Sequence, residues 1–159
     1  MHIHIITVGK VKEKYIKLGI DEFQKRLQPY CTLKFSEVID EKDPEILSEK
    51  QLELVKNKEG ERLLSRIKPD YYVITLDIQG KTMTSEAFAE KIQQINFQGK
   101  SHLSFVIGGS NGLSKEILAR ANEKMSFSAL TFPHQLMKLI LLEQVYRAFK
   151  IQKREPYHK

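Results

Sequence analysis

Three short segments of the sequence have the chemistry of a ligand-binding site, and each follows a hydrophobic stretch of strand length. They are Leu76-Asp77, the glycine-rich loop Gly108-Gly-Ser-Asn-Gly112, and the polar and aromatic run 126–132. Glycines let a backbone approach a ligand closely, and a helix that begins after such a loop favours anions at its N-terminus. The loop lacks both the GxGxxG fingerprint of dinucleotide sites and the lysine of the P-loop. Taken alone, it therefore fits either a ligand contact or a tight turn.

The last four residues, Pro156-Tyr-His-Lys159, combine an aromatic ring, an imidazole and a cation. This set suits an exposed RNA base, which can stack on the ring and hydrogen-bond to the other groups. Residues 147–159 also hold five Lys/Arg and one acid, a net charge of +4 out of +6 for the whole chain. A basic segment favours a polyanion, because each neutralised phosphate releases counterions. The alternative is a disordered, solubilising end.

Residues of metal-binding type are few. His2 and His4 share one face of the first hydrophobic run, with no third ligand at metal-binding spacing. Cys31 is the only cysteine, which excludes an internal disulfide and a cysteine-based metal cluster. We therefore expect no metal. Asp77 and Glu143 are the acids nearest the expected site, although a solvated role suits either equally well.

Strand-like and helix-like patterns alternate along the whole chain and must position these groups. We expect strands over 2–9, 32–38, 71–76 and 103–107, an ambiguous short strand over 125–130, an acidic loop over 40–44, and helices over 11–27, 48–68, 85–97, 114–122 and 133–151. Ser48, Ser85 and Ser114 are the expected N-caps. This alternation predicts an α/β fold, a mostly parallel sheet flanked by helices, in a single domain over 1–159.

Composition agrees with that class. The chain has 159 residues, of which 41% are hydrophobic and 29% charged, a balance typical of a globular protein. No apolar stretch approaches the roughly 20 residues of a membrane span, and the N-terminus lacks the cationic region of a signal peptide. We expect a cytoplasmic protein that does not contact a membrane.

The last predicted helix is apolar around most of its circumference. Its polar side chains form a narrow stripe through Glu143, Arg147 and Lys150. A helix of this kind is buried on more than one side. The second covering surface is either another subunit, which predicts a homodimer with a twofold axis, or the rest of one deeply packed chain.

Six segments in this order resemble one family from end to end. They are Ile5-x-x-Val-Gly-Lys10, Tyr72-Val-Ile-Thr-Leu-Asp-Ile-Gln-Gly-Lys81, Phe105-Val-Ile-Gly-Gly-Ser-Asn-Gly112, Thr131-Phe-Pro-His-Gln135, Glu143-Gln-Val-Tyr-Arg-Ala-Phe149 and Pro156-Tyr-His-Lys159. Together they resemble the RlmH (YbeA-type) family, the bacterial 23S rRNA pseudouridine N3-methyltransferases of the SPOUT superfamily.

This resemblance implies a SPOUT-type fold whose C-terminal part forms a deep trefoil knot, which no pattern argument supplies. It also implies a homodimer that binds S-adenosyl-L-methionine inside the knot. Carried onto this sequence, the cofactor contacts are Leu76, Gly108, Phe127, Ser128, Ala129, Leu130, Thr131 and Phe132. They fall in the three segments that the residue chemistry singles out.

The implied substrate is a pseudouridine in a stem-loop of 23S rRNA, recognised on the assembled 70S ribosome. Its N3 must lose an imide proton, so the site needs a proton acceptor and donors for the developing anion. The expected catalytic residues are His134 as acceptor, Glu143 and Arg147 to orient the base or the tail, and Tyr157 and His158 from the other subunit. The expected RNA-binding residues are Arg154, Tyr157, His158 and Lys159. Because lysine lacks the forked geometry of arginine, Lys159 would act as a point charge.

Two other functions fit parts of the sequence. A non-catalytic module could keep the fold and bind ribosomal RNA through its basic ends. A nucleotide hydrolase could use the glycine loop, although the P-loop lysine and a metal-binding acid cluster are missing. Binding of S-adenosylmethionine would distinguish the methyltransferase from the non-catalytic module. A preference for ATP over S-adenosylmethionine would favour the nucleotide hydrolase.

Overall fold

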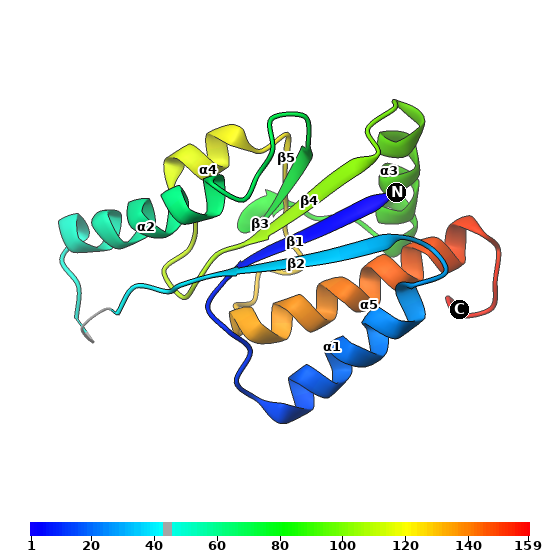
Figure 1. Ribbon diagram of the computed structural model, residues 1–159, viewed down its shortest axis with the longest axis horizontal. Helices are drawn as coiled ribbons and strands as arrows, with labels where there is room; N and C mark the ends of the chain where they lie inside the picture. Colours follow the sequence, from blue (N-terminus) through cyan, green and yellow to red (C-terminus); the bar gives the residue numbers. More distant parts are fainter. Residues whose placement is uncertain (43–45) are drawn as a thin grey trace.

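Five parallel strands form one sheet in the computed structural model, which describes residues 1–42 and 46–159. The strand order is β2-β1-β4-β3-β5 (Figure 1). The strands are β1 (His2–Val8), β2 (Thr32–Val38), β3 (Tyr72–Lys81), β4 (His102–Ile107) and β5 (Glu123–Met125). The prediction of a mostly parallel sheet is therefore confirmed. The acidic loop predicted over 40–44 lies partly outside the described residues.

Helices cover both faces of the sheet, as predicted. The helices are α1 (Lys14–Leu27), α2 (Glu49–Leu64), α3 (Ser85–Phe97), α4 (Lys115–Arg120) and α5 (His134–Gln152). Figure 1 shows α2 and α4 on one side, with α1 and α5 on the other. The larger core packs α1, α3 and α5 against the sheet around the fully buried Phe105, and the smaller core gathers around Val106 under α2 and α4. Neighbouring residues of β4 thus point to opposite faces.

Helix α5 lies between α1 and α3 and packs on both. Leu141, Leu142, Val145 and Ala148 are fully buried beneath it. Its wide apolar circumference is therefore covered on three sides within one chain. This accounts for much of the pattern that predicted a homodimer, which stays a prediction.

Helix starts follow the predicted caps with one exception. Ser48 forms a complete capping box with Gln51, and the Ser114 hydroxyl accepts the N–H of Ile117. The prediction for Ser85 is wrong, because Thr84 caps α3 and accepts the N–H of Ala87. The Ser85 hydroxyl instead donates to the Gln144 side chain of α5.

The predicted strand over 125–130 is also wrong. Strand β5 ends at Met125, and the following residues form a bent loop closed by their own hydroxyls. Ser126 donates to the carbonyl of Ser128, whose hydroxyl accepts the N–H of Leu130. Serine competes with sheet pairing in this way. Among the described residues, no helix is long and apolar enough to cross a membrane.

Candidate cofactor and RNA-binding site

A cavity of about 800 Å³ opens beyond the carboxyl ends of β4 and β5 and beside residues 76–79 of β3, which runs past the end that the sequence predicted at Leu76. Ligands bind at this edge of open parallel sheets. Seven of the eight predicted cofactor residues line the cavity, and Ala129 is the one that does not; the seven are Leu76, Gly108, Phe127, Ser128, Leu130, Thr131 and Phe132. The structure thus brings together three segments that are far apart in the sequence.

Glycine backbone forms one wall of the cavity. A Cβ atom on Gly108 would lie 3.0 Å from the backbone of Gly112, which has a φ of +85°. A Cβ atom on Gly109 would lie 3.2 Å from both Val8 and the buried Glu59. Side chains would therefore not fit at Gly108 and Gly109, and the loop lines the cavity with backbone at these two positions.

Three ionisable side chains line the cavity among the described residues: Lys56, Asp77 and His134. The Asp77 carboxylate accepts the N–H of Gln79 at 2.8 Å. His134 starts α5, and its Nε2 atom would lie 3.5 Å from a Cβ added to Gly9. Sequence reasoning missed Lys56, because it lies on α2 and reaches the glycine loop only in the folded chain.

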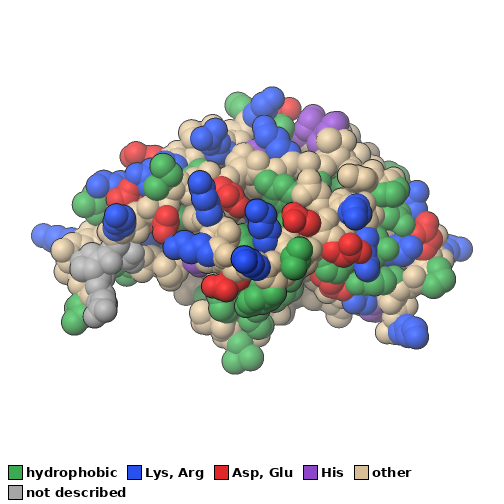
Figure 2. All heavy atoms as spheres, turned by 60° about the horizontal axis from the view of Figure 1, so that its bottom comes forward, with side chains coloured by type: hydrophobic (Ala, Val, Ile, Leu, Met, Phe, Trp, Pro, Cys, Tyr) green, Lys and Arg blue, Asp and Glu red, His purple; other side chains and the backbone are tan. Residues whose placement is uncertain are grey.

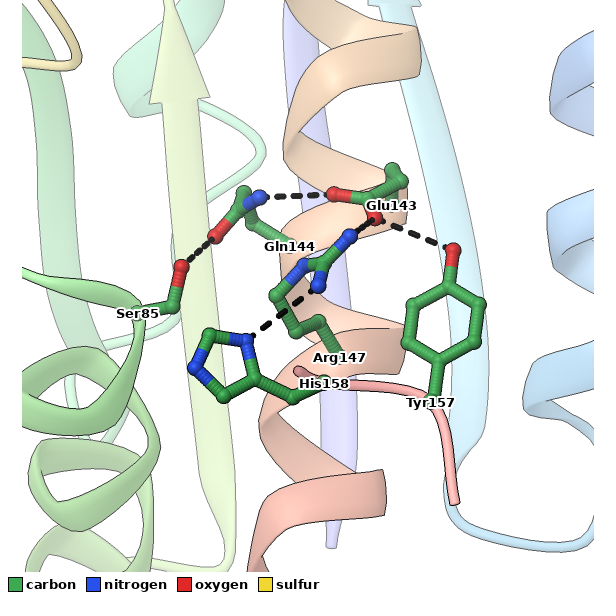
Figure 3. Close-up of polar contacts among 6 residues, drawn as sticks. All are labelled: Ser85, Glu143, Gln144, Arg147, Tyr157 and His158. Carbon is green, nitrogen blue, oxygen red and sulfur yellow. Dashed lines mark hydrogen bonds and ion pairs between the residues drawn. The ribbon is translucent and has the colours of Figure 1, made fainter.

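A second group of polar side chains gathers along α5 and the C-terminal tail; we call Glu143, Arg147, Tyr157 and His158 the tail cluster (Figure 3). Arg147 forms an ion pair with Glu143, and the Tyr157 hydroxyl donates to the same carboxylate at 3.0 Å. The guanidinium of Arg147 also lies over the Tyr157 ring, 4.8 Å from its centroid. Burial and the Glu143 carboxylate raise the pKa of Tyr157. The phenol is thus held as a neutral donor.

His158 lies between a donor and an acceptor. Arg147 can only donate, so the His158 Nδ1 atom, 3.2 Å away, accepts. The Nε2 atom then carries the proton and donates to Glu86 at 2.7 Å. The backbone N–H of Glu86, which donates to the carboxylate of the same residue, and the hydrogen bond from His158 lower the pKa of the Glu86 carboxyl to about 2. The contacts therefore specify both the tautomer and the orientation of the imidazole.

The tail folds back on α5 instead of extending from it. Arg154 turns the chain with a positive φ of 54° and is exposed, as is Lys159. Glu155 then anchors the turn, accepting from Lys150 at 2.6 Å and from the Tyr30 hydroxyl. Both predicted RNA-binding cations therefore project from an anchored segment.

The cavity and the tail cluster lie at different places along α5. His134 is at its first turn, whereas Glu143 and Arg147 come 9 and 13 residues later, about 14 and 20 Å along a helix that rises 1.5 Å per residue. Within one chain, the structure therefore joins His134 to the predicted cofactor residues. It does not join them to Glu143, Arg147, Tyr157 or His158.

Comparison with known proteins agrees with this geometry. The family model described as "Predicted SPOUT methyltransferase" matches residues 1–158. The chain belongs to this family. SPOUT methyltransferase relatives include the "Ribosomal RNA large subunit methyltransferase H" proteins of Bacillus pumilus (strain SAFR-032) and Clostridioides difficile (strain 630), 59% and 56% identical over 100% of both chains.

A solved structure also resembles this chain in its fold. It is titled "The structure of a probable methylase family protein from Haemophilus influenzae Rd KW20". The TM-score is 0.55 at 15% identity, and the match covers 96% of this chain and 66% of that one. At this identity the likeness concerns the fold alone.

Proposed function

We propose that this protein methylates ribosomal RNA of the large subunit and takes the methyl group from S-adenosylmethionine. The observation that carries the proposal is 59% identity, over the full length of both chains, to a protein named as a large-subunit rRNA methyltransferase. We further propose the N3 atom of a pseudouridine in a 23S rRNA stem-loop as the target, on the assembled 70S ribosome.

The cavity supports the choice of cofactor. Its volume of about 800 Å³ lies within the range of small-molecule sites, roughly 300–1,000 Å³. Leu76, Phe127 and Phe132 offer apolar walls for a purine ring, and the peptide groups around Gly108 offer hydrogen bonds to a ribose. Leu76, Gly108 and residues 127–132 would hold the cofactor, which supplies a methyl group on a positively charged sulfur. We place these residues in a deep trefoil knot formed by the C-terminal part of the chain.

His134 is the acceptor that we propose for the imide proton of the target base. Its imidazole lines the cavity, where the base must meet the methyl group in line. Removing the proton makes N3 a nucleophile, and the uracil ring then carries negative charge that hydrogen-bond donors stabilise. Arg147, Tyr157 and His158 are donors of this kind.

These donors must come from a second copy, because in one chain they lie too far along α5. A homodimer with its twofold axis beside α5 would reverse the direction of the partner's helix and bring its tail cluster toward this cavity. Helix α1, which packs beside α5, supports such an interface. Its side chains Tyr15 and Leu18 are 65% and 70% exposed and could be buried against a second copy. Figure 2 shows hydrophobic side chains among acidic and basic ones on this part of the molecule.

The direct test is transfer of labelled methyl groups from S-adenosylmethionine to ribosomes. The substrates are 70S ribosomes from a strain that lacks the modification and, in parallel, the same rRNA stripped of protein. Label in 23S rRNA from intact ribosomes alone is the expected result. Absence of label in both, from a dimer that binds the cofactor, would contradict the proposed target.

Deleting residues 156–159 tests the composite site. We expect methyl transfer to fall to background while S-adenosylmethionine affinity changes by less than about twofold, because the tail cluster lies far from the cavity of its own chain. Titration calorimetry measures the affinity, and sedimentation verifies that the dimer persists. Loss of both cofactor binding and methyl transfer would argue against a site in which one chain binds the cofactor and the other supplies the tail cluster.

A further inference from the structure

Lys56 is the one lysine or arginine side chain among the described residues that line the cavity. It projects from α2 across the glycine loop, so that its Cε atom would lie 3.9 Å from a Cβ on Gly112. The side chain is half-buried, and its stem is therefore held against the protein. This places the Lys56 ammonium group at the glycine-loop end of the cavity.

Several charged side chains near Lys56 form ion pairs, whereas Lys56 forms none with the described residues. Lys58 and Arg62, also on α2, both contact Glu41, and Glu53 contacts Lys115. No carboxylate of the described residues lies within 4.0 Å of the Lys56 ammonium. A half-buried cation that has no counter-charge among the described residues is available for an anionic group of a ligand.

We propose that Lys56 binds the carboxylate of the amino-acid end of S-adenosylmethionine. This inference rests on the proposed function. The cofactor carries three charges, on a sulfonium, an ammonium and a carboxylate, and only the last is negative. Of the cavity's ionisable residues, Asp77 has the wrong sign to bind it, and His134 is proposed to take the proton of the base. Lys56 therefore sets the direction in which the amino-acid end lies, toward the glycine loop and away from Asp77.

The test compares two cofactors that differ only in the carboxylate, namely S-adenosylmethionine and decarboxylated S-adenosylmethionine. Titration calorimetry gives the dissociation constant of each for the wild type and for K56Q. We expect K56Q to weaken binding of S-adenosylmethionine roughly tenfold, as for a lost charge-assisted hydrogen bond, and to leave the decarboxylated compound within twofold. K56R should recover most of the loss.

Lys58→Gln is the matched control, because it removes the same charge from the same helix outside the cavity. It should leave both dissociation constants unchanged. Equal weakening of both cofactors by K56Q, or no change in either, would overturn the proposal. Unchanged cofactor binding with a higher KM for ribosomes would assign Lys56 to an RNA phosphate instead. A wild-type protein that binds neither compound would refute the proposed function itself.

Discussion

Replacing Gly80 by alanine tests whether the contact between β3 and β5 positions the loop 126–132, which lines the cavity. Gly80 lies near the end of β3, where the pairing with β5 shifts in register between Leu76 and Lys81. An added Cβ would lie 2.6 Å from the N and C atoms of Met125 and 2.7 Å from the C atom of Lys124. All three are backbone atoms, so no side-chain rotation relieves the overlap and β5 must move.

The sign of the stability change follows from two opposing effects. Alanine lowers the entropy of the unfolded chain, which by itself stabilises the fold by about 0.4–1 kcal/mol. Overpacking against rigid neighbours costs about 1–3 kcal/mol. The overlap with backbone favours the upper part of that range, so we expect a net loss of about 1–2 kcal/mol. For a chain of this size, the loss lowers Tm by roughly 3–6 °C.

The same displacement reaches the cavity, because residues 125–128 continue from β5 into its lining. We expect G80A to weaken S-adenosylmethionine binding several-fold in titration calorimetry. Gly99→Ala is the control. The φ of +77° at Gly99 means that alanine should lower the free energy of unfolding by about 1–2 kcal/mol. A Cβ added at Gly99 would have no neighbouring atom within 4 Å, and Gly99 does not line the cavity. G99A should lower Tm and leave affinity unchanged. A stabilised G80A protein, or a destabilised one with unchanged affinity, would refute the reasoning.

Two further predictions concern buried charges. Burial is the main cause that lowers the pKa of His4 from 6.5 to about 4, and the positive charges of Lys34 and Arg66 add to it. The unfolded chain therefore binds a proton at a higher pH than the folded chain does. The free energy of unfolding should fall by up to about 3 kcal/mol as the pH drops from about 6.5 to about 4. Urea unfolding across that range should show the loss in wild type and a flatter profile in His4→Gln, and equal slopes would exclude His4 as the cause. Glu37→Gln should lower the free energy of unfolding by about 1–2 kcal/mol, because it leaves the buried Lys138 ammonium, 2.8 Å from the Glu37 carboxylate, without its counter-charge. Lys138→Met removes the buried charge itself and should lower the free energy of unfolding by less than about 1 kcal/mol. Chemical denaturation of both variants decides this, and a costlier K138M would contradict it.

Most elements of the fold could be predicted from periodicity and capping chemistry. Strand β2 has the predicted bounds, and Ser48 and Ser114 act as caps where their spacing places them. Thr84 was missed because threonine and serine are both good caps, and adjacent candidates compete for one position. The run after Met125 has strand-like residues but curls into a loop, since serine hydroxyls satisfy its backbone groups locally.

Part of the candidate site could likewise be predicted from the sequence, and part could not. Segments such as Leu76 and Gly108 could be found because the pairing of β3 with β4 stops at Leu76 and β4 ends just before Gly108, at the same edge of the parallel sheet. Lys56 could not, because nothing in the sequence of α2 indicates that this helix reaches the glycine loop. The separation of His134 from Arg147 needed the helix geometry rather than the motifs. Sequence patterns report local chemistry, whereas contacts between layers depend on the packed sheet.

The strand order has a consequence for synthesis of the chain. Strand β1 is made first and is buried along most of its length, yet one of its two edges pairs with β4, whose residues emerge 100 positions after their partners. At the usual speed of translation, about 5–20 residues per second, that edge stays open for roughly 5–20 s. An apolar strand with an unpaired edge is a template for association with other chains. Because β2 pairs with the other edge of β1, we expect this edge to need protection during synthesis, for example by a chaperone.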